Sequence, residues 1–137
     1  MPCRQHGLIH PEIDDDSREW WDRLRDERLS VARCSSCGHR FFPPAPTCPS
    51  CGREACDLED VSGRGSVYSW VTVHRALDPV FGDDVPYTVL AVDLDEGPRI
   101  FGRLCGNASP EAGQRVLAVI YAVKGQPLVG FGPDPRS

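Results

Sequence analysis

The feature that most constrains this chain is a set of four cysteines arranged as two Cys-x2-Cys pairs. Cys34 and Cys37 form the first pair, and ten residues separate it from the second pair, Cys48 and Cys51. Each pair is followed by a glycine, which supplies the turn that lets the chain leave a metal-binding knuckle. Four thiolates complete a tetrahedral shell and leave no open coordination position for water. The spacing therefore predicts a closed structural metal site, with zinc as the expected ion.

Iron in a rubredoxin-like arrangement is the alternative ion, because thiolate knuckles suit both metals. The ten-residue spacer is more typical of a zinc ribbon. The other three cysteines, Cys3, Cys56 and Cys105, lack partners at ligand spacing, so we expect plain thiols or small apolar fillers there. An odd total of seven cysteines with no export signal favours metal binding over a disulfide framework.

The segment before the cysteines predicts one helix, from about Pro11 to Leu29. Asp16 is the expected N-cap, with Glu19 as its capping-box partner. The helix carries one stripe of large apolar side chains: Trp20, Trp21 and Leu24. That stripe either packs on a core of this protein or docks onto a partner, since aromatic residues concentrate at interface hot spots. A short helix before a small metal module has little core of its own, which gives the docking interpretation weight.

The rest of the chain predicts short strands separated by turn residues. The sequences LSVARC and HRFFPP flank the first cysteine pair and predict a two-stranded hairpin. Five further strands are predicted, at residues 65–74, 87–94, 99–104, 115–122 and 127–131. Five short strands with glycines at the bends fit a small closed or nearly closed β-barrel. We divide the chain into an N-terminal segment with the helix (1–30), a metal ribbon (31–57) and the barrel (58–137).

Charge and hydrophobicity argue against two classes of partner. The 137 residues include 20 acidic and 15 basic side chains, for a net charge of −5, which opposes the basic face of a nucleic-acid binder. No apolar run approaches the roughly 20 residues that span a membrane. No signal peptide is evident, so a cytoplasmic location is the expectation.

Nothing in the sequence predicts a self-sufficient catalyst. None of the four histidines has a nucleophile at a recognisable spacing, and no phosphate-binding glycine loop is present. The acidic pairs around Asp84 and Asp95 are more simply explained as loop and turn residues than as acid–base pairs or a cation site. We therefore assign no catalytic residue.

The order of parts resembles the DUF35 family, acyl-CoA-associated proteins with a rubredoxin-like zinc ribbon joined to an OB-fold. The resemblance rests on the tryptophan helix, the CxxC-x10-CxxC ribbon with a glycine after each pair, the segment SGRGSVYSWVTVHR and the segment PYTVLAVDLDEGPRIFGRL. It covers residues from about Asp15 to Phe131. It implies a mainly β fold made of an N-terminal helix, a zinc ribbon and a five-stranded OB-fold barrel.

The resemblance also implies a function by association. Members of the family are companion subunits of thiolase-fold enzymes acting on coenzyme A thioesters, including lipid-transfer-protein-like thiolases and aldolases of steroid side-chain breakdown. Others are fused or paired with hot-dog-fold hydratases, and because no such domain is evident here, the chain resembles a stand-alone subunit or an excised domain. We therefore expect a non-catalytic accessory subunit of an acyl-CoA lyase or thiolase complex, in steroid side-chain or fatty acyl-CoA catabolism.

Candidate contact residues follow from this expectation. The partner interface is expected at Trp20, Trp21, Leu24, Phe41 and Phe42. The anionic end of coenzyme A needs arginines, and the candidates on or beside the barrel strands are Arg64, Arg75, Arg99 and Arg103. Ordinary surface ion pairs are the alternative explanation for these four. The alternative functions are a free acyl-CoA carrier or sensor and, further behind, a nucleic-acid-binding OB-fold module.

Overall fold

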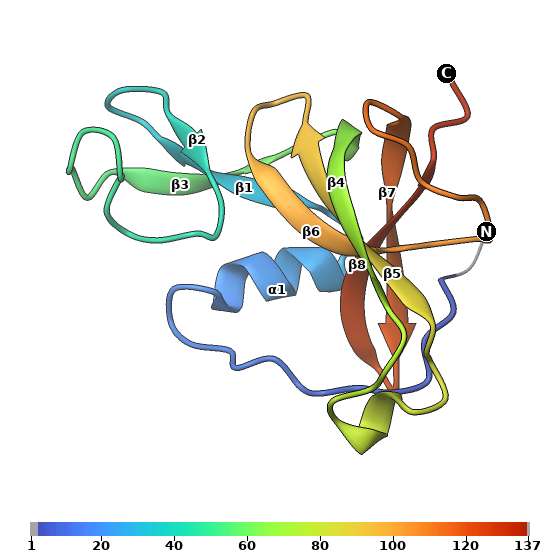
Figure 1. Cartoon of the computed structure of the whole chain (residues 1–137). Coiled ribbons are helices and arrows are strands. Elements are labelled where there is room, and N and C mark those ends of the chain that lie inside the picture. Colours follow the sequence, from blue (N-terminus) through green and yellow to red (C-terminus); the bar gives the residue numbers. More distant parts are fainter. Residues whose placement is uncertain (1–2, 137) are drawn as a thin grey trace.

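The structure is a computed structural model that describes residues 3–136. A small sheet and a barrel lie side by side, and helix α1 (Arg18–Arg25) lies along both of them (Figure 1). The small sheet contains β1 (Ser30–Cys34), β2 (Arg40–Phe41) and β3 (Cys56–Asp60), in the order β2-β1-β3 with antiparallel pairing. The hairpin predicted around the first cysteine pair is confirmed as β1 and β2.

Strand β3 was not predicted, because its sequence CDLED carries three acidic side chains. Its acids gain arginine partners only in the folded sheet. Asp60 accepts hydrogen bonds from Arg23 and Arg28, and Glu59 accepts one from Arg40. The strand also crosses the boundary after residue 57 at which the sequence analysis divided the ribbon from the barrel.

The barrel contains the five predicted strands, each within two residues of its expected bounds. They are β4 (Arg64–Val73), β5 (Tyr87–Leu94), β6 (Arg99–Leu104), β7 (Arg115–Val123) and β8 (Gln126–Pro133). The order β4-β5-β6-β8-β7 closes through antiparallel pairing of β4 with β7, and β6 pairs with β8 in parallel. The long β4–β5 connection includes one 3-10 turn, η1 (Pro79–Phe81).

Helix α1 is shorter than predicted, and its N-cap is Ser17, not Asp16. Asp14 and Ser17 exchange hydrogen bonds: each backbone N–H donates to the side-chain oxygen of the other residue. This reciprocal pair holds residues 14–17 as a separate turn before the helix. At the other end Glu27 adopts a left-handed φ of 61°, which ends the helix before Leu29.

The core is continuous from the barrel interior to the helix. Its buried side chains come from α1, the connection after it, β1 and all of the barrel strands: Trp20, Leu24, Leu29, Val31, Val67, Leu90, Val92, Leu94, Ile100, Val116 and Phe131. Helix α1 thus covers the junction between the two sheets and shares their core. None of the helices among residues 3–136 is long and apolar enough to cross a membrane.

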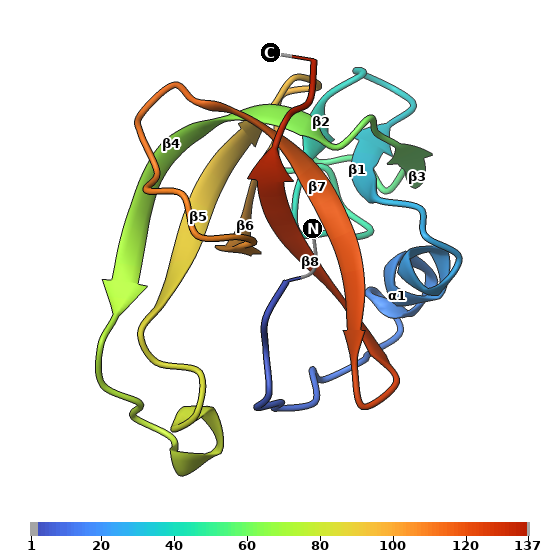
Figure 2. The ribbon, with the colours of Figure 1, turned by 90° about the vertical axis from the view of Figure 1, so that its right-hand side faces the viewer.

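Residues 3–10 form an extended segment, here called the N-terminal strap. Figure 2 shows this blue segment leaving the region of β8 and crossing toward α1. Cys3 forms a disulfide with Cys105, just after β6, and Tyr121 of β7 donates a 2.6 Å hydrogen bond to Gln5. The strap is therefore fixed to the barrel at separate points.

Candidate functional site

The four predicted metal ligands lie together at the end of the ribbon. Their sulfurs are all within 4.8 Å of one another. The Cys34 and Cys51 sulfurs are 3.7 Å apart, and so are those of Cys37 and Cys48. A tetrahedral zinc with Zn–S bonds of about 2.3 Å has sulfur–sulfur edges of about 3.8 Å. The donor set therefore fits a zinc ion, and with four sulfurs in place the site is structural.

The two knuckles are built in the same way. Gly38 donates its N–H to Cys34 O at 2.8 Å, and Gly52 donates to Cys48 O at 2.9 Å. Both glycines have left-handed φ angles, +80° and +78°, as a knuckle exit requires. The backbone N–H of Cys37, with that of Ser36, lowers the pKa of the Cys34 thiol to about 6. At Cys34 the fold therefore favours the thiolate, which is the metal-binding form. At Cys37, burial and the neighbouring cysteine side chains raise the thiol pKa.

The remaining cysteines correct part of the sequence analysis. Cys56 pairs with Cys34 in the β1–β3 register, yet its sulfur is not part of the metal cluster. Cys3 and Cys105 were expected to be unpaired, and this is wrong, because they form a disulfide with Cα atoms 4.4 Å apart. Their sequence separation of 102 positions hid the pairing from any argument based on spacing.

The predicted partner interface is corrected at two positions. Trp20 is 8% exposed and Leu24 is 0% exposed, so neither is available to a partner. The indole of Trp20 donates a 2.8 Å hydrogen bond to Ser30 O, and the ring packs edge-on against Trp21. The docking interpretation underestimated the core, because it did not foresee that the helix bridges the ribbon and the barrel. Trp21, Phe41 and Phe42 are half-buried and remain candidates.

The sequence analysis missed a group of exposed apolar side chains on the barrel. Tyr68, Val71 and Phe101 are 56%, 61% and 69% exposed, and we call them the outer apolar patch. All three lie on the outer face of β4, β5 and β6, whose opposite face carries the buried Leu90 and Val92. A bulge between Val67 and Ser69 shifts the register of β4 at Tyr68. The available signal was the alternation in RIFGRL, which places Phe101 opposite the face of Ile100.

The four arginines proposed for coenzyme A do not converge. Arg64 and Arg99 lie at the end of the barrel where β4 begins, where they pair with Asp134 and Asp93. Arg103 lies toward the other end of β6, paired with Asp84, and Arg75 is exposed in the loop after β4. Of the four, Arg103 lines a sizeable pocket. The ion-pair explanation thus accounts for Arg64, Arg99 and Arg103.

The acidic residues around Asp84 and Asp95 also have structural partners. Asp84 is buried and accepts hydrogen bonds from the N–H groups of His6 and Gly7 and from Arg103. Burial alone raises the pKa of Asp84, but these three donors lower it more, so the net shift is downward. Asp95 forms a bidentate ion pair with Arg115, which lowers the pKa of Asp95. These acids therefore act as fixed carboxylates in ion pairs.

Two family models match the chain. The rubredoxin-like zinc ribbon domain of ChsH2 matches residues 21–58, and the C-terminal OB-fold domain of ChsH2 matches residues 58–120.

Curated relatives agree with these matches. A probable enoyl-CoA hydratase alpha subunit of Thermomonospora curvata is 37% identical over 98 residues, which are 72% of this chain and 30% of the relative. The chain thus spans less than a third of that relative's length. A DUF35 domain-containing scaffold protein of Methanocaldococcus jannaschii is 32% identical over 109 residues, which are 76% of each chain.

One solved structure is similar along almost the whole fold. It is described as an Ltp2-ChsH2(DUF35) aldolase, and its matching chain is 33% identical with a TM-score of 0.82. The match covers 90% of the present chain and 98% of that chain. The fold of helix, ribbon and barrel is therefore shared with that chain.

Proposed function

Because the chain belongs to the DUF35 family of zinc-ribbon and OB-fold proteins, we propose that it is a non-catalytic accessory subunit of a thiolase-fold enzyme. In this role it binds the enzyme and supports its action on acyl-CoA thioesters. The name of the similar aldolase, which joins an Ltp2 chain to a DUF35 chain, supports this assignment. Aldol cleavage or thiolysis in steroid side-chain or fatty acyl-CoA breakdown, in the cytoplasm, is the setting that we propose.

The observation that carries the proposal is the outer apolar patch. Three large side chains, each more than half exposed, share one rigid sheet face. Exposed apolar surface of this kind marks interaction sites, because leaving it in water costs free energy that burial against a partner recovers. We propose that the thiolase-fold partner covers this face, and that Trp21, Phe41 and Phe42 extend the contact toward the ribbon.

The zinc site contributes to this role without taking part in the chemistry. It closes the ribbon, and its four sulfurs leave no position for substrate or water. We propose that the coenzyme A thioester is bound mainly by the partner and is shared at the interface. Arg99 is the candidate nearest the outer apolar patch, since its guanidinium lies 3.5 Å above the Tyr68 ring.

Two alternative functions are weaker on specific grounds. The outer face of an OB-fold, here with Tyr68 and Phe101, can stack nucleic-acid bases. However, the nearby Arg99 is already paired with Asp93, and the chain has a net charge of −5. A free acyl-CoA carrier needs an apolar groove, whereas the pocket beside Arg103 is bordered by the hydroxyls of Thr72 and Thr88.

Co-expression tests the proposed function. The chain is to be produced together with the thiolase-like protein from its own genome and passed through size-exclusion chromatography at micromolar concentration. We expect one co-eluting complex that contains both chains. Separate elution of the two proteins at that concentration contradicts the proposal.

A further inference from the structure

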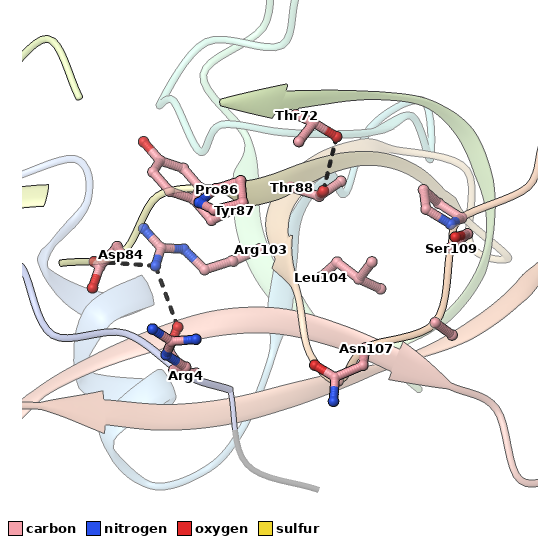
Figure 3. Close-up of a pocket in the computed structure, with 13 residues that line it drawn as sticks. Arg4, Thr72, Asp84, Pro86, Tyr87, Thr88, Arg103, Leu104, Asn107 and Ser109 are labelled. Carbon is pink, nitrogen blue, oxygen red and sulfur yellow. Dashed lines mark hydrogen bonds and ion pairs between the residues drawn. The ribbon is translucent and has the colours of Figure 1, made fainter. Parts of the chain in front are cut away.

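A pocket of about 510 Å³ lies at the end of the barrel where β4 ends and β5 begins. Its walls come from the N-terminal strap, the ends of β4, β5 and β6, and the loop after β6. Figure 3 shows Arg4, Asp84 and Arg103 on one side and Asn107 and Ser109 on the other. The pocket does not include Tyr68, Val71 or Phe101, so it is separate from the outer apolar patch.

The charge of this pocket is opposite to that of the molecule. Among the described residues its lining holds two guanidinium groups, Arg4 and Arg103, and one carboxylate, Asp84, which gives a formal charge of +1. The whole chain has a net charge of −5. The carboxylate of Asp84 already accepts three hydrogen bonds, from His6 N at 2.8 Å, Gly7 N at 3.1 Å and Arg103 at 3.2 Å. The pocket is therefore a local positive site in an acidic protein.

Arg103 is held in position before any ligand arrives, and Arg4 is held more loosely at the rim. The Arg103 guanidinium stacks 3.9 Å from the centre of the Tyr87 ring, and its Nη1 donates to Asp84 and to Arg4 O. Arg4 is exposed at the rim, and its Nη2 lies 3.4 Å from Asp83 O. Side-chain donors complete the lining at Thr72, Thr88, Asn107 and Ser109. Preorganised donors of this kind bind an oxyanion at low cost in entropy.

The disulfide fixes two walls of the pocket to each other. Cys3 precedes Arg4, and Cys105 lies between Leu104 and Gly106, which both line the pocket. Gly130 of β8 makes room for the two sulfurs. A Cβ atom at this position would lie 2.6 Å from the Cys105 sulfur and 2.7 Å from the Cys3 sulfur. The strap, the loop after β6 and strand β8 thus pack closely together at the disulfide.

We propose that this pocket binds an oxyanion, the phosphate or carboxylate group of a small molecule. Arg4 supplies the net positive charge, and Arg103, whose Nη1 is held by Asp84 and Arg4 O, adds further N–H donors. The Cys3–Cys105 disulfide holds Arg4 over the pocket. The site needs no partner subunit and does not rest on the proposed function.

Calorimetry on the full chain tests the site with pyrophosphate and malonate as probes at low ionic strength. We expect saturable binding of at least one probe, and the tighter one identifies the anion class. Arg4→Ala should weaken that binding about tenfold, the effect of losing one charge-assisted contact. Arg18→Ala removes the same charge from an exposed ion pair on α1 and should have no effect. Absence of saturable binding, or equal losses in both variants, overturns the proposal.

The role of the disulfide is tested in a Cys3→Ser/Cys105→Ser variant, with circular dichroism to confirm that it folds. We expect its anion affinity to fall several-fold. Arg4→Ala should then cost less than it does in the parent protein, because the two changes act on the same contact. Unchanged affinity together with an undiminished Arg4→Ala effect would show that the disulfide has no part in binding.

Discussion

At the scale of single residues, Asp84 connects parts of the chain that are far apart in sequence. Its carboxylate joins the strap, through His6 and Gly7, to Arg103 on β6. Its side chain is fully buried in this ion pair, and that of Arg103 is 9% exposed. Burying a carboxylate costs free energy unless its oxygens accept hydrogen bonds. Removing the charge of Asp84 would therefore leave three buried donors without their charged acceptor.

Asp84→Asn is expected to destabilise the protein by about 2 kcal/mol or more at pH 7. The pKa of Asp84 is lower in the folded state than in the unfolded state. The Asp84 carboxylate therefore stabilises the fold fully above the unfolded pKa of about 4. This stabilisation is lost as the pH falls through the folded pKa. The difference from the parent protein should therefore shrink toward pH 3. Urea unfolding at both pH values measures it, with Asp83→Asn, at an exposed neighbour, as the control. A difference that does not change with pH contradicts the assigned role.

The cysteines give a second test at the residue scale. Native mass spectrometry of protein purified without added metal should find one zinc per chain. Cys48→Ser should lose it, because three thiolates bind the ion far more weakly than a closed shell. Cys56→Ser should retain it, since Cys56 lies outside the sulfur cluster. Retention of zinc in Cys48→Ser, or iron in the parent protein, would revise the metal assignment.

At the scale of elements, the sequence predicted those whose residues form a clear local pattern. The barrel strands alternate clearly between turns, and the knuckles have a fixed spacing, so both were predictable. Strand β3 was not, because its acidic residues depend on distant arginines for partners: Arg23 of α1, Arg28 after it and Arg40 of β2. The burial of Trp20 was also hidden, because it follows from how α1 lies over two sheets. The bounds of α1 were missed because the Asp14–Ser17 turn competes with helix for the same residues.

Trp20→Ala tests the corrected role of α1. A buried indole that is lost from the core should cost about 3–5 kcal/mol of stability, seen as a lower midpoint in thermal or urea unfolding. Trp21→Ala should cost less, since Trp21 is only partly buried. If Trp20→Ala unfolds like the parent protein and yet weakens a complex, the original interface prediction was right after all.

At the scale of the whole molecule, the zinc ribbon and α1 pack beside a closed barrel, and the strap is fixed to the barrel through the Cys3–Cys105 disulfide and Tyr121. The sequence motifs were sufficient for the fold class, the metal ligands and the family. Two features could not be predicted from the sequence, because they exist only after folding. They are the outer apolar patch, whose residues come from β4 and β6, and the pocket beside the Cys3–Cys105 disulfide. The patch is the feature that makes a partner subunit the best explanation of this molecule.

The affinity of a Phe101→Glu variant for the thiolase-like partner tests this claim most directly. Phe101 is 69% exposed, so a carboxylate there should leave the fold intact, as an unchanged unfolding midpoint would establish. Because central aromatic residues contribute most of the binding energy of an interface, we predict at least a tenfold loss of affinity in calorimetry. Ile9→Glu, at a 57% exposed position on the strap, is the matched control and should bind like the parent protein. Equal affinities for Phe101→Glu and the parent protein would contradict the account.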